Sequence, residues 1–224
     1  MPATLTHAVL KAKEDENRDG FPKAMGLRVH RSISWIGRAE AAADDDDARF
    51  IFLWIAFNAV YADERALRDD TLGESSVFGD FFRKAVDLDA GRRVYDAIWN
   101  NFSGPIRILM QNRYVFSPFW QHHNGIEGYE DWEDRLWREN RRFERALMGQ
   151  DTAATLRFVF HRLYVLRNQI LHGGATWNSS VNRAQVRDGT AILAFLVPVF
   201  VDIMMDNPNE EWGRPFYPVV DEPG

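Results

Sequence analysis

The chain has 224 residues, 46% of them hydrophobic, which suits a single domain with a packed core. Its formal net charge of −6 excludes a general nucleic-acid binder, which needs concentrated Lys and Arg, so any contact with RNA must be local. The absence of cysteine excludes disulfides, thiol catalysis and Cys-ligated metals.

Helical periodicity dominates from the N-terminal part onward, without strand-type alternation or internal repeats, so the sequence predicts an all-α fold. A first helix is expected over about residues 26–43. A second is expected over about residues 48–68, where apolar side chains surround the helix and predict a buried central position. The acidic run 44–47 supplies an N-cap for this second helix. Asn58, inside it, needs a hydrogen-bonding partner.

Glycine and proline divide the middle of the chain into shorter helical pieces. These are expected at about residues 77–89, 92–101 and 106–114. A long amphipathic helix is expected over residues 129–148, and another over 152–171 with Asp151 as its N-cap. Gly173 and Gly174 supply the left-handed turn that ends the second of these helices.

The C-terminal part of the chain is expected to hold one more helix and a tail. Asn182 and Gln185 fit a capping box that opens a helix running to about Met204. The four prolines that follow predict irregular structure, held to the body by Trp212, Phe216 and Tyr217. The expected organisation is one domain made of three parts. These are an N-terminal extension (1–25), a helical bundle (26–206) and a Pro-rich tail (207–224).

The stretch LYVLRNQILHGGATWNSSVNR places Arg167, Asn168 and His172 at the end of an apolar helical run. An imidazole moves protons near neutral pH and a guanidinium holds a phosphate, so Arg and His together indicate phosphodiester chemistry without a metal. On one helix Arg167 and His172 lie about 140° apart in azimuth and ~7.5 Å apart along the axis. Asn168 and His172 share a face, so Asn168 is expected to orient the imidazole or join it on a phosphate. Two copies about a two-fold axis would bring both pairs together, which predicts a site built by homodimerisation.

An Arg followed by a polar residue and then by a His, at the end of a long helix in an all-α domain, resembles the HEPN superfamily. Further blocks resemble an uncharacterised bacterial HEPN-like family over most of residues 27–220. These blocks are RSISWIGRAE, ARFIFLWIAFNAVY, SPFWQ, RLYVLRNQILHGGATWNSSVNRAQVRDG and WGRPFYPVV. The resemblance implies an up-and-down helical bundle, here with extra helices. It also implies a metal-independent endoribonuclease, in which a ribose 2′-hydroxyl attacks the neighbouring phosphate and leaves a 2′,3′-cyclic phosphate and a 5′-hydroxyl.

By this resemblance, His172 would act as general base or acid, and Arg167 would neutralise charge on the phosphorane, with Asn168 in support. Many such proteins are toxins or anti-phage effectors restrained by a partner, which makes an antitoxin or regulatory protein an expected partner. Toxins paired with a nucleotidyltransferase often carry a modified Tyr two residues after the His. Gly174 stands there in this chain, so silencing by tyrosine modification is not carried over.

Residues after the two glycines are candidates for contacting RNA. Trp177 offers a stacking surface, and Asn178 and Arg183 offer donors to a phosphate of a single strand. A structural alternative stays open, in which the Arg, Asn and His of the motif satisfy the last helix carbonyls and Trp177 packs the turn.

No phosphate-binding glycine loop, dinucleotide fingerprint, nucleophile elbow or repeated metal-ligand spacing is present, so neither a cofactor nor a metal is expected. The longest apolar runs, 50–60 and 191–201, are shorter than the ~20 residues that a bilayer requires. The N-terminus lacks the pattern of a secretory signal. The sequence therefore predicts a cytoplasmic protein without membrane contact.

Two hypotheses of different kinds remain open. One is a dimeric HEPN enzyme that cleaves RNA. The other is a non-catalytic HEPN-like helical module that binds a protein or nucleotide partner. The enzyme requires Arg167 and His172 to be exposed and to converge across a dimer, whereas the module permits either side chain to be buried in structural hydrogen bonds.

Overall fold

The structure, a computed structural model, describes residues 5–62, 74–215 and 217–219. Within these ranges the fold is all-α, with ten α-helices and no strand, as the sequence predicts. The helices are α1 (His7–Asn17), α2 (Lys23–Glu40), α3 (Asp46–Tyr61), α5 (Glu74–Leu88), α6 (Arg93–Asp96), α7 (Ser103–Gln111), α8 (Ser117–His123), α9 (Trp132–Met148), α10 (Thr152–Leu171) and α11 (Arg183–Asp206). Three further helical segments of other types are η1 (Arg18–Gly20), η2 (Ala97–Asn101) and η3 (Arg113–Val115).

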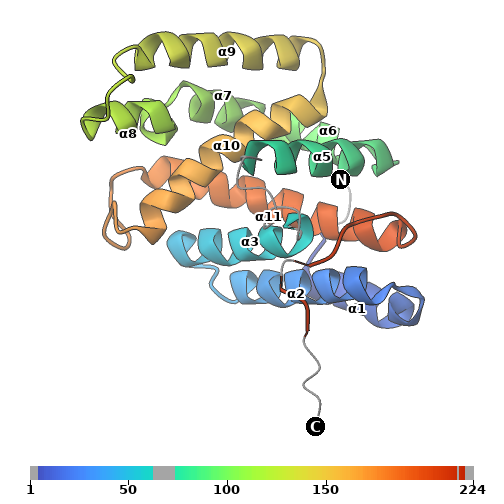
Figure 1. Cartoon of the computed structure of the whole chain (residues 1–224). Coiled ribbons are helices and arrows are strands. Elements are labelled where there is room, and N and C mark those ends of the chain that lie inside the picture. The colour runs from blue at the N-terminus through green and yellow to red at the C-terminus, as the bar shows by residue number, and fades with distance from the viewer. Residues whose placement is uncertain (1–4, 63–73, 216, 220–224) are drawn as a thin grey trace.

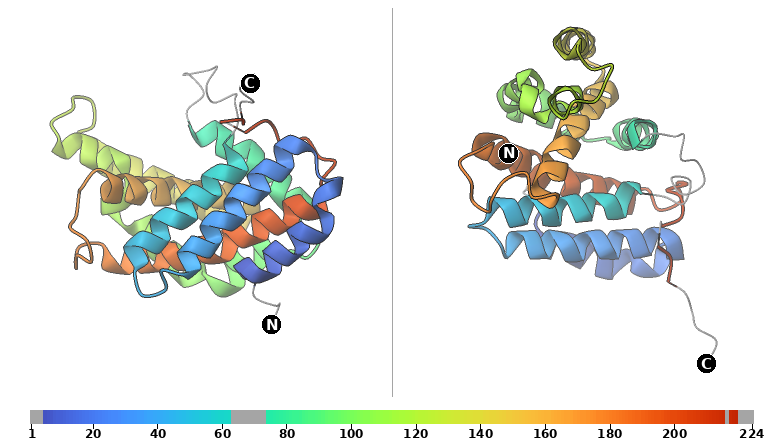
Figure 2. Two further views of the ribbon diagram at one scale, coloured as in Figure 1. Left: turned by 90° about the horizontal axis from the view of Figure 1, so that it is seen from below. Right: turned by 60° about the vertical axis from the view of Figure 1, so that its left-hand side comes forward.

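The helices are stacked in layers, with α1 and α2 at one side of the molecule and α9 at the other (Figure 1). Helices α2 and α3 lie side by side, and α11 packs against both of them. Helix α10 crosses obliquely between the two sides, so it contacts α5, α7 and α9 as well as α3 and α11 (Figures 1 and 2). The end of α10 thereby reaches the layer formed by α2 and α3.

The core is built around α11 and a cluster of phenylalanines. The Phe57 ring of α3 lies 4.5 Å from the Phe160 ring of α10 and 6.2 Å from the Phe200 ring of α11, between centroids. Among the described helices, only α11 is long and apolar enough to cross a membrane by length and composition, and 78% of its apolar window is buried inside the fold. Its apolar side chains are therefore used for packing.

Helix α3 is less buried than its composition predicts. One face packs into the core through residues such as Phe50 and Phe57, but Ile51, Ile55 and Ala59 on another face are only half-buried. The prediction that α3 is the buried central helix is wrong in this respect, because α11 occupies that position. Its predicted end at residue 68 lies outside the described residues, and α3 ends at Tyr61.

Two of the three predicted N-caps are confirmed. A carboxylate oxygen of Asp45, in the acidic run, accepts a hydrogen bond from the Ala48 N–H at 3.0 Å, and Asp151 caps α10 through Ala154 at 2.9 Å. The capping box at Asn182 is wrong. Asn182 has a left-handed backbone (φ +57°), and its side-chain amide donates instead to Gln169 at 2.9 Å.

The N-terminal segment, expected as an extension over residues 1–25, belongs to the bundle in its described part. Residues 7–17 form α1, which packs against α2 and α11 and buries Leu10 and Glu14. Helix α2 begins at Lys23, before the predicted boundary at residue 26. No helix was predicted over α8 either. Pro118 favours it there, because the first turn of a helix needs no N–H from this residue.

The described part of the tail, residues 207–215 and 217–219, is irregular, as predicted. The Trp212 side chain is buried, and its indole N–H donates to the Asn207 carbonyl at 2.9 Å. Tyr217 was expected to pack against the body, but its side chain is 73% exposed. Phe216 lies outside the described residues.

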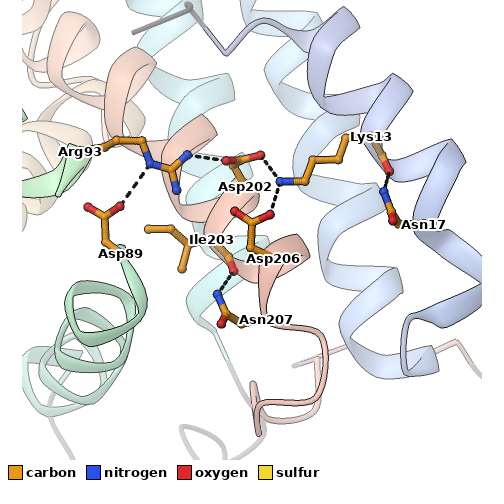
Figure 3. A network of polar contacts seen from close by, with 8 residues as sticks. All are labelled: Lys13, Asn17, Asp89, Arg93, Asp202, Ile203, Asp206 and Asn207. Atoms are coloured by element: carbon orange, nitrogen blue, oxygen red, sulfur yellow. Dashed lines mark hydrogen bonds and ion pairs between the residues drawn. The ribbon is translucent and has the colours of Figure 1, made fainter. Parts of the chain in front are cut away.

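A network of ion pairs ties α1 to α11 (Figure 3). The Lys13 ammonium lies 2.6 Å from a carboxylate oxygen of Asp202 and 2.5 Å from Asp206, and Arg93 pairs with Asp202 and with Asp89. Burial of the Asp202 carboxyl opposes its ionisation. The hydrogen bonds from Lys13 and Arg93 outweigh that effect and hold the pKa of Asp202 below its usual range.

Asp202→Asn is expected to lower the free energy of unfolding by about 1–3 kcal/mol near pH 7, because Lys13 and Arg93 lose their shared carboxylate. The pKa of Asp202 is lowered in the folded state. The contribution of Asp202 to the free energy of unfolding is therefore complete above the unfolded-state pKa of about 3.9, and it is lost as the pH falls through the folded-state pKa. Urea unfolding across that acid range should show a shallower pH dependence in the variant.

The matched control is Asp206→Asn, since Asp206 binds the same Lys13 but is half-exposed. It should cost less than about 1 kcal/mol. Equal losses from the two variants would contradict a central role of Asp202 in the network.

Candidate functional site

Helix α10 ends by hydrogen bonds within its own backbone. Gly173 adopts a left-handed conformation (φ +70°), and the Gly174 N–H donates to the Gln169 carbonyl at 2.7 Å. The N–H groups of His172 and Gly173 donate to the carbonyls of Asn168 and Ile170 at 2.9 and 3.4 Å. This is a Schellman motif. Backbone N–H groups satisfy these carbonyls. The structural alternative instead required the Arg, Asn and His side chains to satisfy them.

Gly174 lies close to the backbone of the preceding turn. A Cβ atom at this position would lie 3.0 Å from the Gln169 carbonyl oxygen, so a side chain here would push that carbonyl by a few tenths of an ångström. The turn that exposes His172 therefore favours glycine at position 174.

Arg167 is half-buried and has no carboxylate partner among the described residues. One guanidinium nitrogen donates to the Asn168 side-chain oxygen at 2.8 Å, and the guanidinium carbon lies 5.3 Å from the centre of the Tyr164 ring. Its Nε atom is buried and has no hydrogen-bond partner within the described part of the chain. The Asn168 oxygen thus faces Arg167, whereas the sequence placed Asn168 with the imidazole.

His172 is the exposed C-cap residue of α10. Its imidazole has no hydrogen-bond or ion-pair partner within the described chain. Arg167 lines a hollow between α2, α3 and α10, and His172 does not. One chain therefore does not bring the two side chains together, in keeping with their expected separation around the helix.

The hollow beside Arg167 has a volume of about 470 Å³. It is bounded by α2, α3, α10 and the tail. Its lining residues are Arg28, Arg31, Trp35, Ile55, Asn58, Ala59, Tyr61, Ala62, Arg167, Pro215 and Tyr217. Asn58 was expected to need a hydrogen-bonding partner, and its buried side-chain oxygen has none among the residues that the structure describes.

The three residues expected to contact RNA lie against the acidic run at the start of α3. The Trp177 indole N–H donates to Asp45 at 2.9 Å, and the Asn178 backbone N–H donates to Asp47 at 2.9 Å. Arg183 donates to the same Asp47 oxygen at 2.7 Å. An RNA phosphate at Arg183 would have to compete with Asp47. The Trp177 side chain is nevertheless 73% exposed, which leaves it open to stacking.

The loop contacts also affect the acidic run itself. Hydrogen bonds to the Asp45 carboxylate hold its pKa below the usual range, chiefly the bond from the Ala48 N–H and, beside it, the bond from Trp177. The carboxylate that caps α3 therefore also fixes the loop after α10. The start of α3 and the end of α10 form one surface.

Large apolar side chains are exposed on this surface. Leu171 is 52% exposed and Val181 is 59% exposed, on either side of the turn that carries His172. Together with Trp177 they are exposed apolar side chains at the end of α10 and in the loop that follows it, a set that we call the α10 rim (Leu171, Trp177 and Val181). Exposed apolar groups gathered in one segment are typical of an interaction surface.

Sequence reasoning assigned no role to Arg31, Trp35 or Tyr61, which line the hollow with Arg167. They lie on two helices at ordinary helical spacing, so nothing in their order distinguishes them from other half-buried positions. The one signal was Asn58, a polar residue inside an apolar helix. Among the residues that the structure describes, no group of three or more His, Asp or Glu could hold a metal ion.

Comparisons with protein-family models, with curated proteins and with solved structures found no match to this chain.

Asp47→Ala is expected to release the loop after α10, because Asn178 and Arg183 lose their common acceptor. Amide hydrogen exchange over residues 176–182 should become at least about tenfold faster, which corresponds to about 1.4 kcal/mol of lost local stability. The control is Asp44→Ala in the exposed part of the same run. Unchanged exchange in Asp47→Ala would show that the loop is fixed by other contacts.

Proposed function

We propose that this chain is a metal-independent endoribonuclease of the HEPN type, built on a HEPN-like up-and-down bundle with extra helices. The observation that carries the proposal is the state of the motif at the end of α10. Arg167 has no carboxylate partner in the described chain, His172 is exposed, and neither is used to cap the helix. A guanidinium and an imidazole left free in this way are suited to a phosphodiester.

The proposed reaction uses the ribose 2′-hydroxyl as nucleophile. The His172 imidazole takes the proton of this hydroxyl as its oxygen bonds to the phosphorus, and the imidazolium so formed gives the proton to the 5′-oxygen as the P–O bond breaks. Arg167 stabilises the negative charge on the phosphorane, and Asn168 holds the guanidinium in place. The products are a 2′,3′-cyclic phosphate and a 5′-hydroxyl.

The proposed site is completed by a second copy of the chain. Within one chain Arg167 faces the hollow and His172 faces solvent, so a single copy does not supply both groups to one phosphate. A two-fold axis through the α10 rim would bring together both copies of the motif. The exposed Leu171 and Val181 supply apolar surface for such a homodimer.

The contact with RNA is proposed to be local. The chain carries a net charge of −6, and Arg183 is neutralised by Asp47, so binding depends on the motif and on stacking against Trp177. An RNA-cleaving activity in the cytoplasm must be restrained. A toxin or defence role with an antitoxin or regulatory protein as partner is therefore part of the proposal.

The second candidate is a non-catalytic helical module that binds a partner. The observation that favours it is the hollow itself, which holds Arg167 and the unsatisfied Asn58 away from His172. In a module of this kind Arg167 would bind a ligand and His172 would have no chemical role. The two candidates differ in whether His172 is needed for activity on RNA.

Wild-type protein is expected to cleave total RNA or tRNA in EDTA, with 2′,3′-cyclic phosphate ends on the products. His172→Ala and Arg167→Ala should each reduce the cleavage rate by about 100-fold or more, because proton transfer and charge stabilisation each contribute on this scale. The rate is measured on end-labelled RNA, and product ends are identified by their resistance to phosphatase.

The matched controls are His123→Ala and Arg141→Ala, which remove an exposed histidine and an exposed arginine from other helices. Both should cleave at the wild-type rate. No cleavage by wild type, or equal cleavage by wild type and the folded His172→Ala variant, would reject the nuclease and favour the module.

A further inference from the structure

The hollow between α2, α3 and α10 has the size of a small-molecule site. Its volume of 470 Å³ lies within the range of about 300–1,000 Å³ that ligand pockets occupy. The tail closes one side of it, where the Tyr217 carbonyl accepts a hydrogen bond from Arg31 at 2.6 Å. The hollow is thus bounded by four segments that are distant in sequence.

Its positive charge is not compensated by the described lining. Arg31 and Arg167 both line the hollow, and no Asp or Glu does so among the described residues. Arg31 donates to a backbone carbonyl and Arg167 to an amide oxygen, so neither guanidinium has a carboxylate partner there. A negatively charged group in the hollow would meet two donors of this kind.

A second arginine-rich hollow of 410 Å³, between α8, α9 and α10, shows the contrast. There Asp131 pairs with Arg135 and Arg138, and Glu139 lies 3.1 Å from the buried Arg162. Among the described residues, carboxylates pair with the arginines of this second hollow and none lines the first. This difference points to an anion as the group that completes the first.

Asn58 and Arg167, which both line the first hollow, carry buried polar atoms without a hydrogen-bond partner in the described chain. These are the side-chain oxygen of Asn58 and the Nε atom of Arg167. Buried polar groups are almost always paired, and a ligand in the hollow that supplies a donor and an acceptor would satisfy both atoms. Asn58 requires a donor from that ligand, and Arg167 requires an acceptor.

Two rings beside these groups are held by stacking. The Trp35 ring lies 5.7 Å from the Phe52 ring, and the Tyr61 ring lies 4.5 Å from the Phe57 ring, between centroids. Such fixed aromatic faces at the edge of a hollow favour a flat ring in the ligand. The charge, the unpaired atoms and the rings of the lining therefore each indicate a different part of one ligand.

We propose that this hollow binds a small organic anion that carries a flat ring with a hydrogen-bond donor. Its phosphate or carboxylate pairs with Arg31 and Arg167, its ring packs against Trp35 and Tyr61, and its N–H or O–H donates to the Asn58 oxygen. This binding does not depend on RNA cleavage. It is a property of the single chain.

The test uses two probes that share the ring and the donor, 4-aminophenyl phosphate and 4-aminobenzoate, with binding followed by titration calorimetry on the full chain. At least one should bind with a Kd below about 1 mM, and the tighter of the two identifies the anionic group. Arg31→Ala should weaken this binding at least tenfold. Arg141→Ala on α9 serves as control and should bind as wild type does.

Asn58→Leu tests the hydrogen bond from the ligand's donor independently of the ligand's negative charge. The variant removes the unsatisfied oxygen, so the Tm of the free protein should rise. Its affinity for 4-aminophenyl phosphate should fall to its affinity for phenyl phosphate, which lacks the amino donor. Absence of binding by both amino probes at about 10 mM, or equal binding by wild type and Arg31→Ala, would overturn the proposal. Because no RNA is present, failure here leaves the cleavage experiment unaffected.

Discussion

The left-handed conformation of Gly173 is the constraint on which the candidate site depends. It ends α10 through the chain's own backbone, with the Gly174 N–H bound to the Gln169 carbonyl. The chain then turns back toward α3, where Asp45 and Asp47 bind the loop. As a result the motif side chains are not needed as caps. His172 is left on the surface, and Arg167 extends into the neighbouring hollow.

The arginines of this fold differ in the groups that their guanidinium groups contact. The buried Arg28 donates to three backbone carbonyls, those of Val60, Ala62 and Arg214, and so joins α2, the end of α3 and the tail. Burial lowers the pKa of Arg162 to about 10 against the opposing charge of Glu139, and this side chain contributes to packing over the Phe116 ring. Arg31 and Arg167 differ from these residues. They line one hollow whose described lining holds no Asp or Glu, which leaves their charge available for a ligand.

Local signals in the sequence predicted the ends of α10 and the start of α3, because an N-cap and a glycine turn act within a few residues. Helix α1 was missed, since it buries only Leu10 and Glu14 and therefore has little apolar periodicity. Helix geometry predicted the separation of Arg167 and His172. The contacts of Trp177 and Arg183 with the acidic run could not be predicted from the sequence, because they join residues more than 130 positions apart. The hollow could not be predicted from the sequence for the same reason, because the segments that line it are distant in sequence.

The central claim is that two copies of the chain form one cleaving site, and mixing two inactive variants tests it most directly. In a mixed dimer of Arg167→Ala and His172→Ala, one copy supplies the imidazole and the other supplies the guanidinium. The account predicts that the mixture cleaves RNA in EDTA although each variant alone does not. A mixture that stays inactive, with mixed dimers demonstrated by mass spectrometry and wild type active in parallel, would contradict a shared site.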